Sequence, residues 1–406
     1  MRRRALLFRI GILEPKFDGW TAGPKYIRTL THCLVSACKQ SAAELFFFSE
    51  RETEENRRIC LPSDVHRVFA REIAVRGEQR VREFLGLRER SRLYYYAQKY
   101  GMSVVVPCTD VSTHSYGLRM IGWIPDFQHV YLPQLFSEEN RQYRDAAYRR
   151  VAQQTQVVML SSHIAAEHFS AFVPEYAYKA RVLQFPSTYA FEHSNGDPST
   201  VLEKFRLPAK FALIANQFWQ HKNHLTVIDA LQRLSCQGVR IPLVMTGLPA
   251  DYRDPTNEHL SRILQAVASS GLTDQVTILG MVPQADLHDL LRCAALIIQP
   301  SRFEGWSTSV QDAKALGRPL LCSDIPVHHE QVPGALGFFP CDKAAALVDL
   351  LARVWNRLNP GPEPENEQKA LAAEREFAES QGRLLLNLCL EAAAGRSAGV
   401  NSEKHS

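Results

Sequence analysis

Two carboxylates, Glu304 and Asp312, flank a run of hydroxyl-bearing residues and are the first candidates for chemistry in this chain. Glu304 lies in a glycine-containing loop where no helix requires a charge, and loops at strand ends commonly carry function. A helix N-terminus with hydroxyl groups beside it can bind an anion such as a phosphate. We therefore expect one polar crevice to include Glu304, the first turn of the helix that follows, and the neighbouring residues Gly305, Ser307, Thr308 and Ser309.

Asp312 has two interpretations. The run 309–312 reads Ser-Val-Gln-Asp, a capping-box pattern in which the acid hydrogen-bonds back to the residue that caps the helix. Alternatively, Asp312 faces the crevice and contacts a ligand. The local pattern alone favours the capping role.

The elements around these residues form a strand–loop–helix–strand unit. Residues 294–298 are a short apolar run, as in a strand buried on both faces, and residues 310–316 have a helical pattern. Gly317 ends that helix, Pro319 follows, and residues 320–322 form a second buried strand. In such a unit, ligands bind beyond the carboxyl ends of the strands.

The spacing of Glu304 and Asp312 resembles the E-x7-E signature of the retaining, nucleotide-sugar-dependent glycosyltransferases of family 4, which are group 1 glycosyltransferases with the GT-B fold. The second acid is Asp here instead of Glu. The resemblance implies that Glu304 binds hydroxyls of the transferred sugar and that Asp312 binds the ribose of the nucleotide.

A second candidate group lies in residues 216–224, directly after the apolar run 211–215. The Lys222 ammonium could meet a diphosphate at a helix N-terminus there, although a surface lysine is the common alternative. The resemblance implies an Arg five residues before this Lys, where the chain has Gln217. Charge neutralisation would then depend on Lys222, helped by His221 or His224 when protonated. By the same resemblance, the backbone around Val282 would contact the nucleobase.

The amino-terminal half contains four further candidates. Gly23 follows the predicted first strand, residues 6–13, and the resemblance places its loop near the donor phosphates. Asp126 and His129 share a proline-bounded loop, which indicates either a polar site or a structural histidine. By resemblance, His129 contacts the sugar near the reacting carbon. Ser162 resembles a strand-end serine of the family and is assigned, with Asp126, to the acceptor side.

Strands and helices alternate on both sides of a Pro-, Gly- and Ser-rich segment, residues 185–208, which predicts an α/β protein with two doubly wound sheets. We expect an amino-terminal, acceptor-side Rossmann-like domain over 1–190 and a nucleotide-sugar-binding one over 205–365. A GT-B fold would place the two facing a central cleft. A helix over 366–394 would brace the first domain, and residues 395–406 would form a disordered tail.

Composition narrows the function classes. The net charge of +4 from 47 basic and 43 acidic residues gives no reason to expect nucleic acid. The nine cysteines form no CxxC pair, which is typical of reduced thiols in a cytoplasmic protein. No acidic cluster has metal-ligand spacing, and we expect neither a metal nor a cofactor. Residues 71–92, with seven arginines and four glutamates, are either a solvated helix or a peripheral contact to the inner face of a membrane.

The resemblance to the family 4 enzymes implies a retaining glycosyltransferase that moves a hexose from a nucleoside diphosphate sugar to a hydroxyl of a glycan or lipid-linked acceptor, in polysaccharide or glycolipid biosynthesis. Two alternatives remain open. One is an enzyme on the same fold, such as a nucleotide-sugar epimerase or a phosphorylase. The other is a catalytically silent sugar-nucleotide-binding subunit, for which Gln217 and Asp312 are the signs.

Overall fold

The chain divides into two units, each built around one parallel sheet. The computed structural model describes residues 8–14, 22–39, 41–49, 64–69, 92–109, 117–191, 197–251 and 253–395. Unit 1 comprises Met1–Phe185 and Phe377–Ser406, and unit 2 comprises Pro186–Glu376. The first boundary falls within the segment that the sequence marks as a linker, and the second falls inside the last helix.

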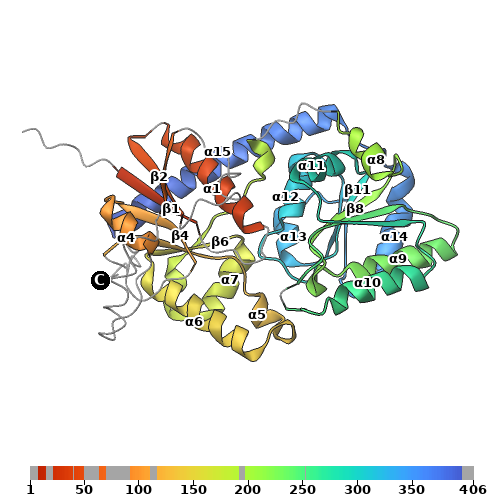
Figure 1. Cartoon of the computed structure of the whole chain (residues 1–406), viewed down its shortest axis with the longest axis horizontal. Helices are drawn as coiled ribbons and strands as arrows, with labels where there is room; N and C mark the ends of the chain where they lie inside the picture. Colours follow the sequence, from red (N-terminus) through yellow and green to blue (C-terminus); the bar gives the residue numbers. More distant parts are fainter. Residues whose placement is uncertain are drawn as a thin grey trace, which may run out of the picture. The chain divides into compact units, whose positions relative to one another are not determined.

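Unit 1 contains a seven-stranded, parallel sheet in the order β3-β2-β1-β4-β5-β6-β7 (Figure 1). Its strands are β1 (Phe8–Leu13), β2 (Ala43–Ser49), β3 (Val65–Phe69), β4 (Val104–Cys108), β5 (Met120–Ile124), β6 (Val157–Leu160) and β7 (Ala180–Val182). Its helices are α1 (Ala22–Cys38), α4 (Arg92–Lys99), α5 (Gln128–Tyr131), α6 (Glu138–Gln154) and α7 (His163–Phe172), with 3-10 turns η2 (Pro133–Leu135) and η3 (Pro174–Lys179).

Unit 2 contains a six-stranded, parallel sheet in the order β10-β9-β8-β11-β12-β13. Its strands are β8 (Ala212–Ala215), β9 (Leu243–Thr246), β10 (Val276–Gly280), β11 (Leu296–Gln299), β12 (Leu320–Ser323) and β13 (Gly337–Phe339). Its helices are α8 (Thr200–Phe205), α9 (His224–Cys236), α10 (Glu258–Ser269), α11 (Gln284–Cys293), α12 (Thr308–Ala315), α13 (Pro326–Gln331) and α14 (Ala344–Val354), with 3-10 turns η4 (Thr188–Ala190), η5 (Gln220–Lys222) and η6 (Trp355–Arg357).

Alternate residues of the central strands of unit 2 enter two different cores. Leu296 and Ile298 of β11 pack with residues of α9, α10 and α14, whereas Ile297 packs with residues of α11 and α12. Figure 1 shows these two sets of helices on opposite faces of the sheet. Because both faces are covered, the strands are continuously apolar, and the polar residues of this region collect at the strand ends.

The last helix, α15 (Pro364–Ala394), belongs to both units. Within unit 1, Leu385, Leu388 and Cys389 join the core cluster that contains the buried face of α1. A Cβ on Gly382 would overlap the carbonyl of Cys33, so glycine permits the close approach of these two helices. An ion pair of 2.6 Å between Arg181 and Glu391 also holds this part of α15.

The strands and helices expected from the sequence occur in the structure with ends shifted by one to three residues. Residues 71–91, the candidate membrane contact, and the predicted tail from 396 onwards lie outside the described residues. The described cysteines are free, and most of them are buried. Within the described ranges, no helix is both long and apolar enough to cross a membrane, and no group of His, Cys, Asp or Glu could hold a metal ion.

Candidate active site

The candidate site of unit 2 is organised around β8 and β11, which are adjacent in the sheet although 83 residues separate Asn216 from Gln299 at their ends. The strand order reverses between them, since β9 and β10 lie beyond β8 while β12 and β13 lie beyond β11. Ligands of doubly wound proteins bind beyond the carboxyl ends of strands at such a point. The loops that carry Lys222 and Glu304 both begin there.

Lys222 and Glu304 form an ion pair. The Lys222 Nζ lies 2.6 Å from Glu304 Oε1, and the two side chains are 14% and 8% exposed. The structure therefore brings together the residue expected on the diphosphate and the residue expected on the sugar, in direct contact with each other. Burial strengthens the attraction between the two charges but removes water from each of them. Removal of either partner would therefore leave a poorly hydrated, unpaired charge, which is strongly destabilising.

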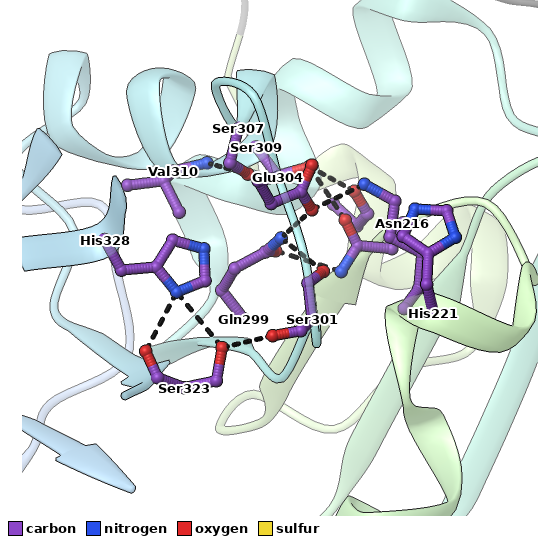
Figure 2. Close-up of polar contacts among 12 residues, drawn as sticks. Asn216, His221, Gln299, Ser301, Glu304, Ser307, Ser309, Val310, Ser323 and His328 are labelled. Atoms are coloured by element: carbon purple, nitrogen blue, oxygen red, sulfur yellow. Dashed lines mark hydrogen bonds and ion pairs between the residues drawn. The ribbon is translucent and has the colours of Figure 1, made fainter. Parts of the chain in front are cut away.

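A buried amide network holds the carboxylate of Glu304 (Figure 2). Gln299 Nε2 donates to Glu304 Oε1 at 3.0 Å and to Ser301 Oγ at 3.0 Å, while Gln299 Oε1 accepts from Asn216 Nδ2 at 2.9 Å. Ser309 Oγ donates to the carbonyl of Ala215 at 2.5 Å, which ties the first turn of α12 to the end of β8. The network positions Glu304 because Gln299, which donates to it, is held in turn by hydrogen bonds with Ser301 and Asn216.

The capping-box interpretation of residues 309–312 is wrong. Ser307 is the N-cap of α12 and accepts from the N–H of Val310, whereas Ser309 is already inside the helix. Asp312 is 3% exposed, and its Oδ1 accepts a hydrogen bond of 2.6 Å from Ser187 Oγ. The carboxylate thus binds the segment where the chain enters unit 2, and its contact with ribose stays a prediction.

A second buried acid lies beside this contact. Glu374 accepts hydrogen bonds from the N–H of Ser187 at 2.6 Å and from Gln311 Nε2 at 2.9 Å. Burial raises the pKa of Glu374, while the hydrogen bonds from Gln311 and Ser187 oppose that shift. Both chain segments that lead out of unit 2 are therefore hydrogen-bonded to α12.

The expectation that His221 or His224 adds positive charge is wrong. Both side chains are buried. Burial, with neighbouring cations, lowers the pKa of His221 well below its ordinary value and that of His224 to about 3, so both imidazoles are neutral at pH 7. Gln217 Nε2 is buried and has no hydrogen-bond partner among the described residues. Arg302, which sequence reasoning missed, contributes an exposed cation two residues before Glu304, and its guanidinium binds Asn223 Oδ1 at 2.9 Å.

The remaining donor-side candidates lie in the same unit. Gly305 is buried next to Glu304, and Thr308 is the first residue of α12. Val282 packs against the core after β10, beyond Gly280, whose carbonyl accepts from Thr246 Oγ1 at 2.7 Å. These positions follow the carboxyl ends of β10 and β11.

The remaining candidates belong to unit 1. Gly23 is buried in the first turn of α1. Asp126 Oδ1 accepts from the N–H of Gln128, and Ser162 Oγ accepts from the N–H of Ala165 as the N-cap of α7. Asp126 and Ser162 therefore each have a local structural role, Asp126 in a turn and Ser162 as a helix cap.

His129 is buried, with only 2% of its surface exposed. Its Nε2 lies 3.0 Å from Asp145 Oδ1, and its ring packs among the rings of Phe127, Phe136, Tyr148 and Phe172. Burial and the charge of Arg144 lower its pKa, against the opposite effect of Asp126 and Asp145. The Nδ1 has no partner among the described residues. His129 is thus held as a core side chain of unit 1, and its contact with a sugar stays a prediction.

Sequence reasoning also missed a histidine near Glu304. His328 on α13 is fully buried, and its Nδ1 lies 3.0 Å from the carbonyl of Ser323 and 3.1 Å from Ser323 Oγ. Burial lowers its pKa to about 4; the charge of Glu304 acts in the opposite direction. The available signal was a polar residue in the short segment after the buried strand 320–322, since Glu304 was identified in the segment after β11.

Comparison with known proteins agrees with this geometry. Residues 202–358 match the family model of glycosyl transferases group 1. An O-antigen chain mannosyltransferase B from Escherichia coli is 28% identical over 127 residues, 31% of this chain and 32% of that protein. A mannosylfructose-phosphate synthase from Agrobacterium fabrum is 28% identical over 133 residues, 32% of this chain and 29% of that protein. The matches thus span about a third of the curated relatives' length.

Solved structures match almost the whole chain. A glycosyltransferase from Rickettsia africae superimposes with a TM-score of 0.64 at 15% identity, covering 95% of this chain and 98% of that one. Anabaena HepE in complex with UDP-glucose superimposes with a TM-score of 0.60 at 13% identity, covering 96% and 100%. The region that surrounds Lys222 and Glu304 thus matches the model of the group 1 glycosyltransferases, and the chain has the GT-B fold of these solved structures.

Proposed function

We propose that this protein is a retaining glycosyltransferase that transfers a hexose from a nucleoside diphosphate sugar to a hydroxyl acceptor. The observation that carries the proposal is the ion pair between Lys222 and Glu304 at the strand-order reversal of unit 2. The names of the mannosyltransferase relatives and the UDP-glucose complex of the HepE neighbour support the substrate class. Its place in polysaccharide or glycolipid assembly, with a glycan or lipid-linked acceptor, rests on the same relatives.

The ion pair suits such a donor because the donor offers a new partner to each of the two side chains. A diphosphate is an anion that takes up the ammonium of Lys222, and sugar hydroxyls are donors that satisfy the carboxylate of Glu304. Each charge therefore exchanges one partner for another and is not left unpaired when the substrate binds. The transition state combines a departing diphosphate with a sugar ring that gains positive charge, and fixed charges of these signs stabilise both.

Lys222 is tested by binding. Lys222→Ala should weaken the binding of UDP or GDP, whichever the parent prefers, by at least about tenfold, which corresponds to about 1.4 kcal/mol. Lys210→Ala is the matched control, because Lys210 precedes the same strand β8 at its opposite end and binds the carbonyl of Trp355. Equal affinities of the two variants by calorimetry would remove Lys222 from the site.

Glu304 is tested by turnover. Glu304→Gln should lower sugar transfer by at least about tenfold, or about 1.4 kcal/mol of transition-state stabilisation, and should not weaken the binding of the free nucleoside diphosphate. The anomeric configuration of the product, measured by NMR, decides whether transfer proceeds with retention. Parent-like transfer by the variant would contradict the assignment of Glu304.

A second candidate is a subunit that binds a sugar nucleotide without transferring it. Two observations favour it: Gln217 adds no charge where the family has Arg, and the carboxylate of Asp312 is already bound by Ser187. The parent protein distinguishes the two candidates, since a transferase hydrolyses its donor slowly even without an acceptor and enlarges an acceptor when one is supplied.

A further inference from the structure

The imidazole of His328 is held in a single tautomer. Its Nδ1 approaches the carbonyl oxygen of Ser323, which can only accept a hydrogen bond, so Nδ1 carries the proton. The hydroxyl of Ser323 donates to the carbonyl of Ser301 at 2.5 Å, and this oxygen therefore also accepts from Nδ1. A neutral ring protonated at Nδ1 presents a lone pair at Nε2. His328 is consequently a hydrogen-bond acceptor on its other edge.

That acceptor has no partner. His328 Nε2 is a buried atom without a hydrogen bond from any residue that the structure describes. Figure 2 shows this edge of the ring turned away from Ser323, to the side of Glu304 and the start of α12. An unsatisfied buried acceptor destabilises a fold unless a ligand or water donates to it, so such an atom beside a candidate site calls for a donor.

Glu304 has an unused acceptor as well. Both described hydrogen bonds to its carboxylate, from Lys222 and from Gln299, end on Oε1. Within the described residues, Oε2 accepts none. The charges of Glu304 and Lys222 both act on the His328 ring, which places all three groups in one neighbourhood. This neighbourhood therefore offers two hydrogen-bond acceptors to a ligand that supplies donors.

We propose that His328 Nε2 and Glu304 Oε2 together accept hydrogen bonds from two hydroxyl groups of the transferred sugar. The inference rests on the proposed function and makes His328 a sugar-binding residue of unit 2. Because His328 is fully buried, a hydroxyl reaches Nε2 only after a neighbouring group moves. Lys222 is the group whose partner changes on binding, since the diphosphate draws its ammonium away from Glu304 Oε1.

Two substitutions at His328 distinguish the roles of its two ring nitrogens. In His328→Asn, the side-chain amide can still donate to the carbonyl of Ser323 from the place of Nδ1, but nothing occupies the place of Nε2. In His328→Gln, the longer side chain returns an acceptor to the place of Nε2. His329→Asn is the matched control, because His329 is the exposed neighbour on the same helix and pairs with Asp324.

The experiment measures the affinities of UDP-glucose, GDP-mannose, UDP and GDP for the full chain and these three variants by calorimetry. His328→Asn should weaken the preferred nucleotide sugar about tenfold and leave its free diphosphate within about twofold, as expected for the loss of one hydrogen bond. His328→Gln should recover part of the loss, and His329→Asn should match the parent. An equal loss for the sugar nucleotide and the diphosphate would show a purely structural role and overturn the inference.

Deoxy analogues identify the hydroxyl. The 2-, 3-, 4- and 6-deoxy forms of the preferred donor should each be compared in the parent and in His328→Asn. One of them should bind equally to both proteins, because the hydroxyl that His328 accepts is absent from it. If the ratio between the two proteins stays the same for the parent sugar and all four analogues, no hydroxyl donates to His328 and the inference fails.

A spectroscopic readout tests the same contact without activity. In protein labelled with ¹⁵N-histidine, His328 should show a protonated Nδ1 and an unprotonated Nε2, and the Nε2 resonance should move when the nucleotide sugar is added but not when the free diphosphate is. A parent protein that binds no nucleotide sugar would refute the proposed function, and this inference with it. A parent that binds and transfers sugar, with an unchanged Nε2 resonance, would refute this inference alone.

Discussion

The ion pair between Lys222 and Glu304 makes a quantitative prediction about stability. Replacing Lys222 by Met leaves a carboxylate that is 8% exposed without its cation, and removal of one partner from such a buried pair typically costs about 3 kcal/mol. Glu304→Gln is milder, at about 1.5 kcal/mol, because the ammonium is somewhat more exposed and the amide oxygen still accepts from it. The double variant removes both charges together and should cost only about 1 kcal/mol, since a neutral pair needs no compensation.

The two single losses therefore exceed the double loss by about 3.5 kcal/mol, which is the coupling energy of the pair. The assay is thermal and urea unfolding of the parent and the three variants. In a domain of this size, 1 kcal/mol corresponds to about 2–4 °C, so Lys222→Met should melt about 6–12 °C below the parent, and the double variant should recover most of that difference. Effects that add to within about 0.5 kcal/mol would refute the reasoning, because the two charges would then not depend on each other.

Three further predictions follow from the structure. If Asp312 binds ribose, Asp312→Asn should weaken the binding of a ribonucleoside diphosphate more than the binding of its 2′-deoxy analogue. If it only anchors Ser187, calorimetry will show equal effects on both ligands, and the free energy of unfolding will fall by about 1–3 kcal/mol because a buried hydrogen bond is lost. Burial lowers the pKa of His328 to about 4, from about 6.5 in an unfolded chain. Between these two pH values the unfolded state binds more protons than the folded state. The free energy of unfolding should therefore fall as the pH drops through this range, by up to about 1.4 kcal/mol per pH unit. Urea titrations of His328→Asn at several pH values should show a pH dependence that is smaller by about one bound proton. An unchanged dependence would contradict the conclusion that the His328 ring is buried and neutral. Gly247 has φ 155°, and a Cβ there would overlap the carbonyl of Asn216; Gly247→Ala should therefore destabilise unit 2 by about 3 kcal/mol and weaken nucleotide binding, and parent-like unfolding would show that the loop after β8 tolerates the displacement.

Most of the local structure was predictable from the sequence. The apolar runs before Asn216 and Pro300 indicate strands because a strand covered on both faces has no polar side. The helix after Ser307 was predictable from its hydroxyl-bearing start and from Gly317 at its end. These signals lie within a few residues of each other, and the backbone follows them because capping, turn formation and burial periodicity are local effects.

The identity of the helix cap was predicted incorrectly for a physical reason. Ser307, Thr308 and Ser309 are adjacent and all have side-chain oxygens, so the pattern alone could not decide which oxygen caps α12. Tertiary contact decided it: Ser309 Oγ is taken by the carbonyl of Ala215 in the neighbouring strand, and Ser307 is left to cap the helix. The two histidines next to Lys222 were misjudged similarly, because their charge depends on burial that no local pattern reveals.

The sequence by itself determined which residues carry charge at the ends of the strands, and thereby Glu304, Lys222 and the class of ligand that they suit. Only the tertiary structure decided their partners. Lys222 and Glu304 are 82 positions apart, and Ser187 and Asp312 are 125 apart, so each pairing depends on strand order and helix packing. The same holds for His328, whose free nitrogen becomes meaningful only when Ser323 fixes its tautomer and Glu304 lies nearby. Hydrogen bonds and ion pairs act over a few ångströms, and folding alone sets which distant residues come within that range.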